Sequence, residues 1–112
     1  MEPRFKSFTE FWPFYVCEHG KPLTRALHFI GTATILPLAL LAWFASPWFL
    51  AAVPVSAYGF AWLAHFFVER NRPATFTYPA WSLLGDLRMF ALMCLGRMGA
   101  EVVRCQQVRA GE

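Results

Sequence analysis

The sequence predicts an all-α fold: an integral membrane helical hairpin with an N-terminal interfacial helix and a C-terminal amphipathic helix. The chain of 112 residues is 57% hydrophobic and 15% charged, which makes it more apolar than an ordinary soluble domain. Residues 26–68 contain no Asp, Glu, Lys or Arg, and this is enough chain for two membrane crossings of about 20 residues each. We therefore expect a single membrane-embedded domain over residues 1–112.

The uncharged segment divides into two predicted spans, residues 26–46 and 47–68. Ser46-Pro47 offers a turn between them, and proline is well tolerated at the first position of a helix. Basic residues flank the hairpin and its tip is uncharged, and such flanks favour the cytoplasmic side of a membrane. Both termini are therefore expected in the cytoplasm. The flanking basic residues are Lys21, Arg25, Arg70 and Arg72.

Two further helices are expected outside the hairpin. An aromatic helix within residues 1–25 suits the level of the lipid headgroups and should end at the "HGKP" of residues 19–22. A third helix is expected over residues 81–105, lying along the interface or packing against the hairpin, because its longest uncharged run is too short to cross. The tail, residues 106–112, is expected to fray.

Charge and cysteine content narrow the class of protein. The net charge of +3 is modest, and the arginines lie beside apolar segments, which favours a membrane surface over nucleic acid as partner. The three cysteines contain no CxxC pair, so we expect buried thiols and no disulfide framework. A two-span hairpin leaves much side-chain surface to cover, which is compatible with a homo-oligomer.

Histidines are the candidate functional residues. In a tight antiparallel hairpin that turns at residues 46/47, residues at equal depth have numbers that sum to about 93, which predicts that His28 and His65 lie at one level. Glu69 follows His65 by one helical turn and shares its face. His19 can join them if the chain folds back at residues 20–22.

Three neutral imidazoles and a carboxylate suit Fe(II), Mn(II) or Zn(II). Two histidines, one carboxylate and open positions are typical of non-haem iron that activates O₂. The alternative is that the histidines only hydrogen-bond carbonyl groups and that Glu69 only pairs with Arg72. Asp86 and Arg88 interrupt an apolar helix, where they either orient a ligand histidine, hold a substrate carboxylate or form a solvated face.

Two stretches carry a resemblance to a known family. "FYVCEHGKPLTRALHFIG" (14–31) and "AWLAHFFVERNRPATF" (61–76) are similar to the Mpo-type small membrane proteins, long catalogued as a domain of unknown function, whose fungal member is an Fe(II)-dependent 2-hydroxy-fatty-acid dioxygenase. The resemblance covers most of residues 10 to 98. Its most specific part is H-x-x-x-E-x-x-R-P-A, and here these positions are His65, Glu69, Arg72, Pro73 and Ala74.

The chain departs from the fungal pattern at one position. The fungal member is longer and has two adjacent histidines where this chain reads Glu18-His19. Glu18 is either a metal ligand of another kind or a sign of changed chemistry. Metal binding therefore carries over better than the reaction does.

The resemblance implies α-oxidation, in which a 2-hydroxy fatty acid reacts with O₂ and becomes an acid one carbon shorter. It implies Fe(II) held by His19, His28 and His65, with Glu69 as a further ligand or as a partner of a ligand. Arg70 or Arg72 would attract the substrate carboxylate.

Two functions of other classes remain open at the level of sequence. A pair of histidines facing each other across a hairpin also suits haem b, which would make the protein an electron carrier. A non-enzymatic membrane adaptor or lipid-binding hairpin needs no metal at all.

Overall fold

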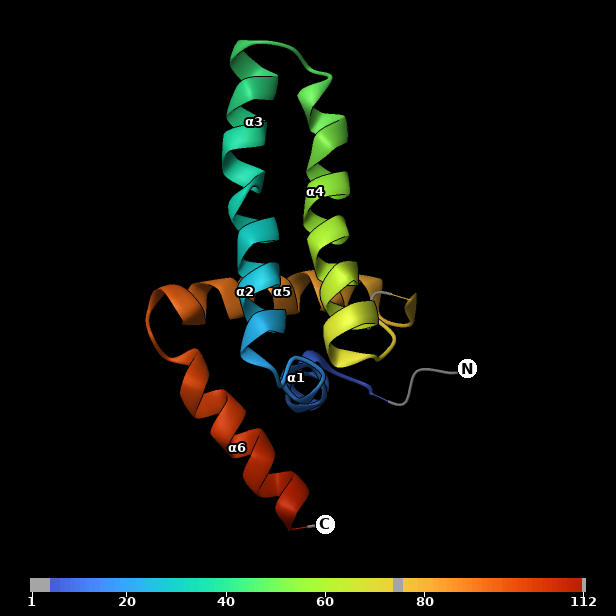
Figure 1. The fold of residues 1–112 in the computed structure, drawn as a ribbon, viewed down its shortest axis with the longest axis vertical. Helices are drawn as coiled ribbons and strands as arrows, with labels where there is room; N and C mark the ends of the chain where they lie inside the picture. The colour runs from blue at the N-terminus through green and yellow to red at the C-terminus, as the bar shows by residue number, and fades with distance from the viewer. Residues whose placement is uncertain (1–4, 74–75, 112) are drawn as a thin grey trace.

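The computed structural model describes residues 5–73 and 76–111, and within these ranges the chain is helical, with no strand. A two-armed helical hairpin stands on a base made of the remaining helices (Figure 1). The all-α prediction is therefore confirmed. Ala74, the last residue of the family-like motif, lies outside the described residues.

Each arm of the hairpin consists of two helical segments. The first arm is α2 (Pro22–Ala33) followed by α3 (Ile35–Phe44), and the second is α4 (Phe49–Leu63) followed by a short π-helix, η1 (Ala64–Glu69). The turn between the arms contains Ser46 and Pro47, as predicted.

The first arm begins and breaks where its prolines dictate. It begins at Pro22 and not at residue 26, because proline fits the first turn of a helix, where its missing N–H is not needed. The break at Thr34 follows from Pro37, which has no N–H to donate to the carbonyl of Ala33 and whose ring crowds that carbonyl.

Both arms are long and apolar enough to cross a membrane. The segments are Pro22–Phe44 and Phe49–Glu69, and only 11% and 17% of their most apolar windows are buried. At the tip, Trp43 and Trp48 are each 83% exposed. A core helix of a soluble protein is mostly covered by other elements, whereas these arms present large apolar side chains that need a cover.

A glycine lets the two arms approach closely. A Cβ atom at Gly31 in α2 would lie 3.0 Å from the carbonyl oxygen of Ala57 in α4 and 3.2 Å from Cβ of Phe60. Near the same level Thr34 Oγ1 and Ser56 Oγ, 2.8 Å apart, hydrogen-bond across the hairpin. This contact fixes the depth of one arm against the other.

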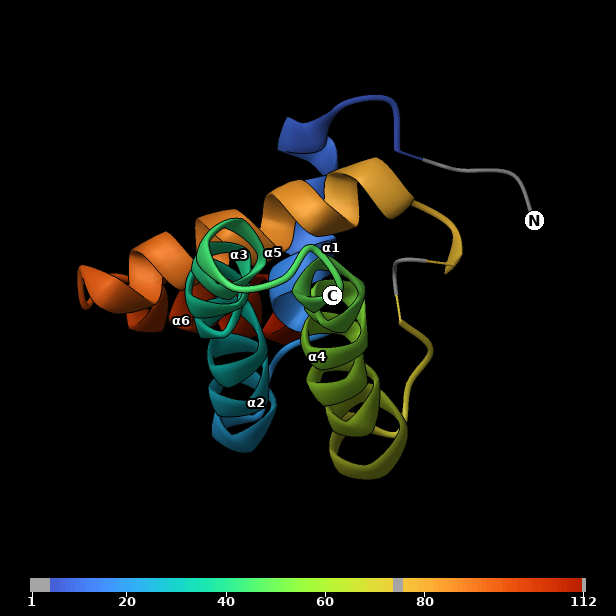
Figure 2. The same ribbon diagram turned by 90° about the horizontal axis from the view of Figure 1, so that it is seen from above.

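The base contains α1 (Phe8–Cys17), α5 (Pro79–Cys94) and α6 (Met98–Ala110). Figure 2 shows α5 running across the foot of the hairpin, and it packs against both α2 and α1. The hydrophobic core lies here and not between the arms. Its buried residues are Phe11, Trp12, Tyr15, Val16, Tyr78, Met89, Met98 and Val102.

The location of this core shows what covers the aromatic helix. Phe11 and Tyr15, expected at headgroup level, are 0% exposed. They are covered because α5 crosses α1 closely: a Cβ atom at Gly85 would lie 2.9 Å from the Tyr15 ring. The aromatic side chains of α1 thus form the core on which the hairpin stands.

The predicted third helix is in fact two helices. Gly96 has a φ of +70°, which ends α5 in the left-handed region that glycine adopts without strain. The N–H of Arg97 then donates to the carbonyl of Leu92. The prediction of one helix over residues 81–105 was wrong because the chain turns at Gly96, and the tail expected to fray is helical as far as Ala110.

The prediction for the cysteines was also wrong. Cys17 at the end of α1 and Cys105 in α6 form a disulfide, with their Cα atoms 5.7 Å apart. Cys94 is free but exposed. Sequence alone cannot pair cysteines separated by 88 positions, because the pairing depends on how α6 packs on α1.

We predict that Gly31→Val destabilises the protein by about 1–3 kcal/mol, since the added atoms meet the backbone of α4. The measurement is thermal unfolding of purified protein in detergent. Gly59→Val is the matched control, because a Cβ atom there meets nothing within 4 Å. Equal stability of the two variants would show that the arms do not pack through Gly31.

Candidate metal centre

Three buried histidines from three different segments meet at the foot of the hairpin. His19 lies in the loop after α1, His28 in α2 and His65 in η1, and they are 1%, 5% and 2% exposed. The Nε2 atom of His19 is 3.1 Å from that of His28 and 3.1 Å from that of His65. The prediction that the hairpin brings His28 and His65 together, and that the chain folds back to add His19, is confirmed.

A hydrogen bond at Nδ1 of His19 decides which of its two ring nitrogens carries the proton. Its Nδ1 lies 2.6 Å from the carbonyl oxygen of Tyr15. A carbonyl can only accept, so Nδ1 is the N–H donor and Nε2 keeps a lone pair. Burial, together with the neighbouring His28 and His65, holds the pKa of His19 well below its usual value, so the ring is neutral.

His65 has the same protonation pattern for a different reason. Its Nδ1 is 2.6 Å from Oδ1 of Asn71. The amide nitrogen of Asn71 donates to the carbonyl and to the carboxylate of Glu18, which leaves its oxygen as the acceptor. His65 therefore donates from Nδ1 and turns a lone pair on Nε2 towards His19.

His28 faces a carboxylate. Its Nδ1 is 3.4 Å from Oδ1 of Asp86 in α5, which favours the proton on that nitrogen. Tyr15 donates a hydrogen bond to the same carboxylate oxygen. Burial, and then the charge of Asp86, raise the pKa of Tyr15 well above its usual value, so the phenol stays protonated and donates.

The result is three imidazoles whose Nε2 atoms converge, and those of His19 and His65 carry lone pairs because their protons are on Nδ1. The three candidate ligand atoms lie within 4.8 Å of one another. Two imidazole nitrogens bound to one metal at about 2.0–2.1 Å, with an angle of about 90–110° between the bonds, lie about 2.8–3.4 Å apart. The Nε2 atom of His19 is 3.1 Å from Nε2 of His28 and from Nε2 of His65, within that range. By their chemistry, three such nitrogens suit a divalent transition metal, which would leave further coordination positions for other ligands.

Local backbone features place His65 in this cluster. It lies in η1, which is a π-helical turn. Such turns are rare in proteins, and those that occur are often found at functional sites. Arg70 ends this turn with a φ of 59°, and the N–H of Asn71 then donates to the carbonyl of His65. The reversal brings the Asn71 side chain back under the imidazole that it orients.

Glu69 does not join the three ligand atoms. Its Oε2 accepts hydrogen bonds from the N–H of Lys21, at 2.7 Å, and from Oγ1 of Thr24, at 2.5 Å. It thus ties the end of η1 to the beginning of α2, and a carboxylate is favourable at this N-terminus. The geometry suits a residue that holds two histidine-bearing segments together better than a direct ligand.

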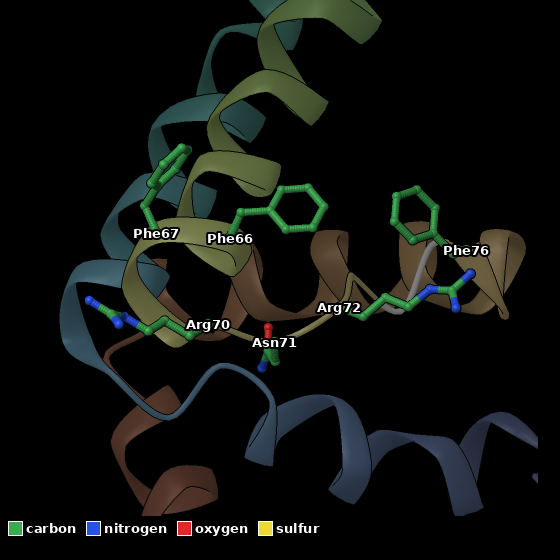
Figure 3. Close-up of a pocket in the computed structure, with 6 residues that line it drawn as sticks. All are labelled: Phe66, Phe67, Arg70, Asn71, Arg72 and Phe76. Atoms are coloured by element: carbon green, nitrogen blue, oxygen red, sulfur yellow. The ribbon is translucent and has the colours of Figure 1, made fainter.

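The two arginines of the motif-like region diverge. Figure 3 shows the guanidinium groups of Arg70 and Arg72 pointing in opposite directions with Asn71 between them. Arg72 lies over the ring of Phe76, with Cζ 5.1 Å from its centroid. Both line an open surface groove of about 660 Å³ with Phe66 and Phe67. None of the three histidines lines this groove.

Sequence reasoning identified the imidazoles but missed much of what orients them. Asp86 lies at His28, one of the roles left open for it, whereas Arg88 stacks on Trp12, 4.5 Å from its ring, away from the cluster. Tyr15 lies in the aromatic helix that was expected at the lipid headgroups, and no pattern distinguishes Asn71. No periodic pattern reveals Asn71, because a left-handed residue separates it from the helix that carries His65.

Comparisons with known proteins agree with the geometry. A model of the family described as "2-hydroxy-palmitic acid dioxygenase Mpo1-like" matches residues 5–98. Comparison with curated proteins and with solved structures gave no match. The matched range contains all three histidines and the residues that orient them. The chain therefore belongs to the 2-hydroxy-palmitic acid dioxygenase Mpo1-like family.

Proposed function

We propose that the protein is an Fe(II)-dependent dioxygenase that shortens 2-hydroxy fatty acids by one carbon. The observation that carries the proposal is the convergence of three imidazole Nε2 atoms in a buried site, in a chain whose family is named for a 2-hydroxy-palmitic acid dioxygenase. Imidazole ligands with open positions suit iron that activates O₂.

The reaction balances without any further reductant. A 2-hydroxy acid, R–CH(OH)–COOH, and O₂ give R–COOH, CO₂ and H₂O, so the substrate supplies all four electrons. Bound iron would supply the activation of O₂ and an attachment point for the carboxylate and hydroxyl oxygens of the substrate.

The residues of the chain hold and orient this centre. His19, His28 and His65 would supply the nitrogens. The Tyr15 carbonyl and Asn71 accept the Nδ1 protons of His19 and His65, and Asp86 lies 3.4 Å from Nδ1 of His28, so these groups orient the rings. Their burial keeps bulk water from the ligands. Glu69 accepts a hydrogen bond from the N–H of Lys21 and so holds the loop after His19 against the helical turn that carries His65.

Arg72 is proposed to attract the substrate before it reaches the metal. It lines the open groove with Phe66 and Phe76, so a fatty acid meets a cation and apolar rings together there. A guanidinium binds a carboxylate with charge-assisted hydrogen bonds.

The two other functions are less well supported. A haem held between His28 and His65 would need the space that His19 fills. The Nε2 atom of His19 is 3.1 Å from Nε2 of His28 and 3.1 Å from Nε2 of His65. A non-enzymatic adaptor gives no reason for three imidazole nitrogens from three segments to face one another out of water.

We further propose that the hairpin is inserted in a membrane with both termini in the cytoplasm. The exposed apolar arms support insertion, and the basic residues at the base support the orientation. The disulfide between Cys17 and Cys105 lies at the same end, whereas cytosolic cysteines are normally kept reduced. The charge pattern favours the cytoplasmic orientation, and there we expect cytosolic reductants to open this disulfide.

Membranes that contain the protein should convert 2-hydroxypalmitic acid, in the presence of Fe(II) and O₂, into the acid one carbon shorter. Glu69→Gln should reduce this activity by about 10–100-fold, the usual loss when a partner of metal ligands is changed. Mass spectrometry of the fatty acids is the measurement. Glu10→Gln is the matched control, because Glu10 also accepts from a backbone N–H, but at the exposed start of α1.

Two outcomes would contradict this account. Wild-type protein that carries iron yet shortens no 2-hydroxy acid of any chain length would remove the proposed reaction. A Glu69→Gln variant as active as Glu10→Gln would keep the reaction but remove Glu69 from the site.

Topology is tested by labelling in intact cells. Ser46→Cys, in a Cys94→Ser background, should react with a membrane-impermeant maleimide from outside. Cys17 and Cys105 should alkylate without prior reduction once the membrane is permeabilised. The orientation would be the reverse if the Ser46→Cys variant were labelled at the tip only after permeabilisation and if Cys17 and Cys105 reacted only after a reductant was added.

A further inference from the structure

A second cavity, distinct from the groove of Figure 3, begins at the histidine cluster. It has a volume of about 130 Å³ and lies among α2, α3, α4 and α5. Two of its lining residues are His28 and Asp86, which belong to the metal centre. The groove of Figure 3, by contrast, is lined by none of the three histidines.

The rest of the lining is mainly apolar and follows the hairpin away from the base. Along the first arm the cavity extends from His28 to Ile35, about 10 Å of helix at 1.5 Å per residue. On the second arm it is lined by Val53 and Ala57, and α5 contributes Leu83 and Leu87. Leu83, Asp86 and Leu87 share one face of α5, because positions i, i+3 and i+4 coincide on a helix.

We propose that this cavity binds the alkyl chain of the substrate next to its carboxyl end. The inference rests on the proposed function and adds where the chain lies. A fatty acid has a polar end and an apolar chain, and the cavity combines His28 and Asp86 at the base with mainly apolar side chains that continue along the arms towards the tip. In an inserted hairpin this direction is also from the headgroup level into the lipid.

The size of the cavity limits which part of the chain it holds. Pockets that enclose a whole small ligand measure about 300–1,000 Å³, and this one is smaller. It therefore takes only the first carbons, and the remainder must leave sideways. Leu83 and Leu87 are 47% and 48% exposed, so the α5 side offers an apolar exit into the surrounding lipid. Chain selectivity should consequently act near the carboxyl end and be weak at the far end.

The test uses a 2-hydroxypalmitic acid that carries a photoreactive diazirine on carbon 5, with the iron-loaded protein in vesicles of phosphatidylcholine. The expected result is labelling of residues that line the cavity, such as Ala57 or Leu83, and competition by unlabelled 2-hydroxypalmitic acid. Ala57→Leu should weaken labelling by at least about tenfold, since single methylene groups in an apolar pocket alter discrimination by about 10–200-fold. Its iron content should stay unchanged.

Ala51→Leu is the matched control, since Ala51 is exposed on the same helix and does not line the cavity. It should label like the wild type. Labelling that maps to the Figure 3 groove, or that competing phospholipid removes but 2-hydroxypalmitic acid does not, would overturn the proposal. Cavity labelling without any shortened acid would uphold the binding site and refute the reaction, so the two proposals fail separately.

Discussion

Three buried imidazoles whose Nε2 atoms face one another are the constraint on which the rest of the structure depends. Nδ1 of His19 and of His65 donates to a carbonyl or an amide oxygen, and Nδ1 of His28 lies 3.4 Å from the carboxylate of Asp86. The Nε2 lone pairs of His19 and His65 are therefore turned towards the cluster, and burial removes the water that would satisfy them. A divalent cation would bind such lone pairs, and this is why we interpret the cluster as a metal centre.

The architecture divides the work between hairpin and base. The hairpin sets His28 and His65 at one depth, with Gly31 bringing the arms together. The base then supplies what orients the rings: α1 contributes Tyr15, and α5 contributes Asp86. The buried aromatic core beneath the cluster thus acts on function as well as stability, since it fixes the acceptors for the Nδ1 protons.

The sequence predicted those parts of the site that depend on simple geometry. The pairing of His28 with His65 follows from the position of the turn alone, and the approach of His19 follows from the break at residues 20–22. The contacts of Asn71 and Tyr15 could not be predicted, because they depend on a left-handed residue after a π-helix and on the crossing of α1 with α5. Gly96 is a residue that commonly ends a helix, but the apolar residues on both sides of it favoured one continuous helix in the prediction.

The position of Glu18 gives a physical meaning to the departure from the fungal pattern. Its carboxylate accepts from the Asn71 amide, which in turn fixes His65. A residue that differs from a family histidine can thus support the site through another ligand without binding metal itself. The three-histidine centre remains complete with Glu18 in this place.

X-ray absorption spectroscopy of protein loaded with Fe(II) without oxygen tests the central claim most directly. The account predicts one iron per chain, with the scattering pattern of three imidazole rings and nitrogen distances of about 2.0–2.2 Å, close to those of other divalent metal–imidazole bonds. An iron shell without imidazole, a haem spectrum, or folded protein that binds no transition metal at all would contradict it.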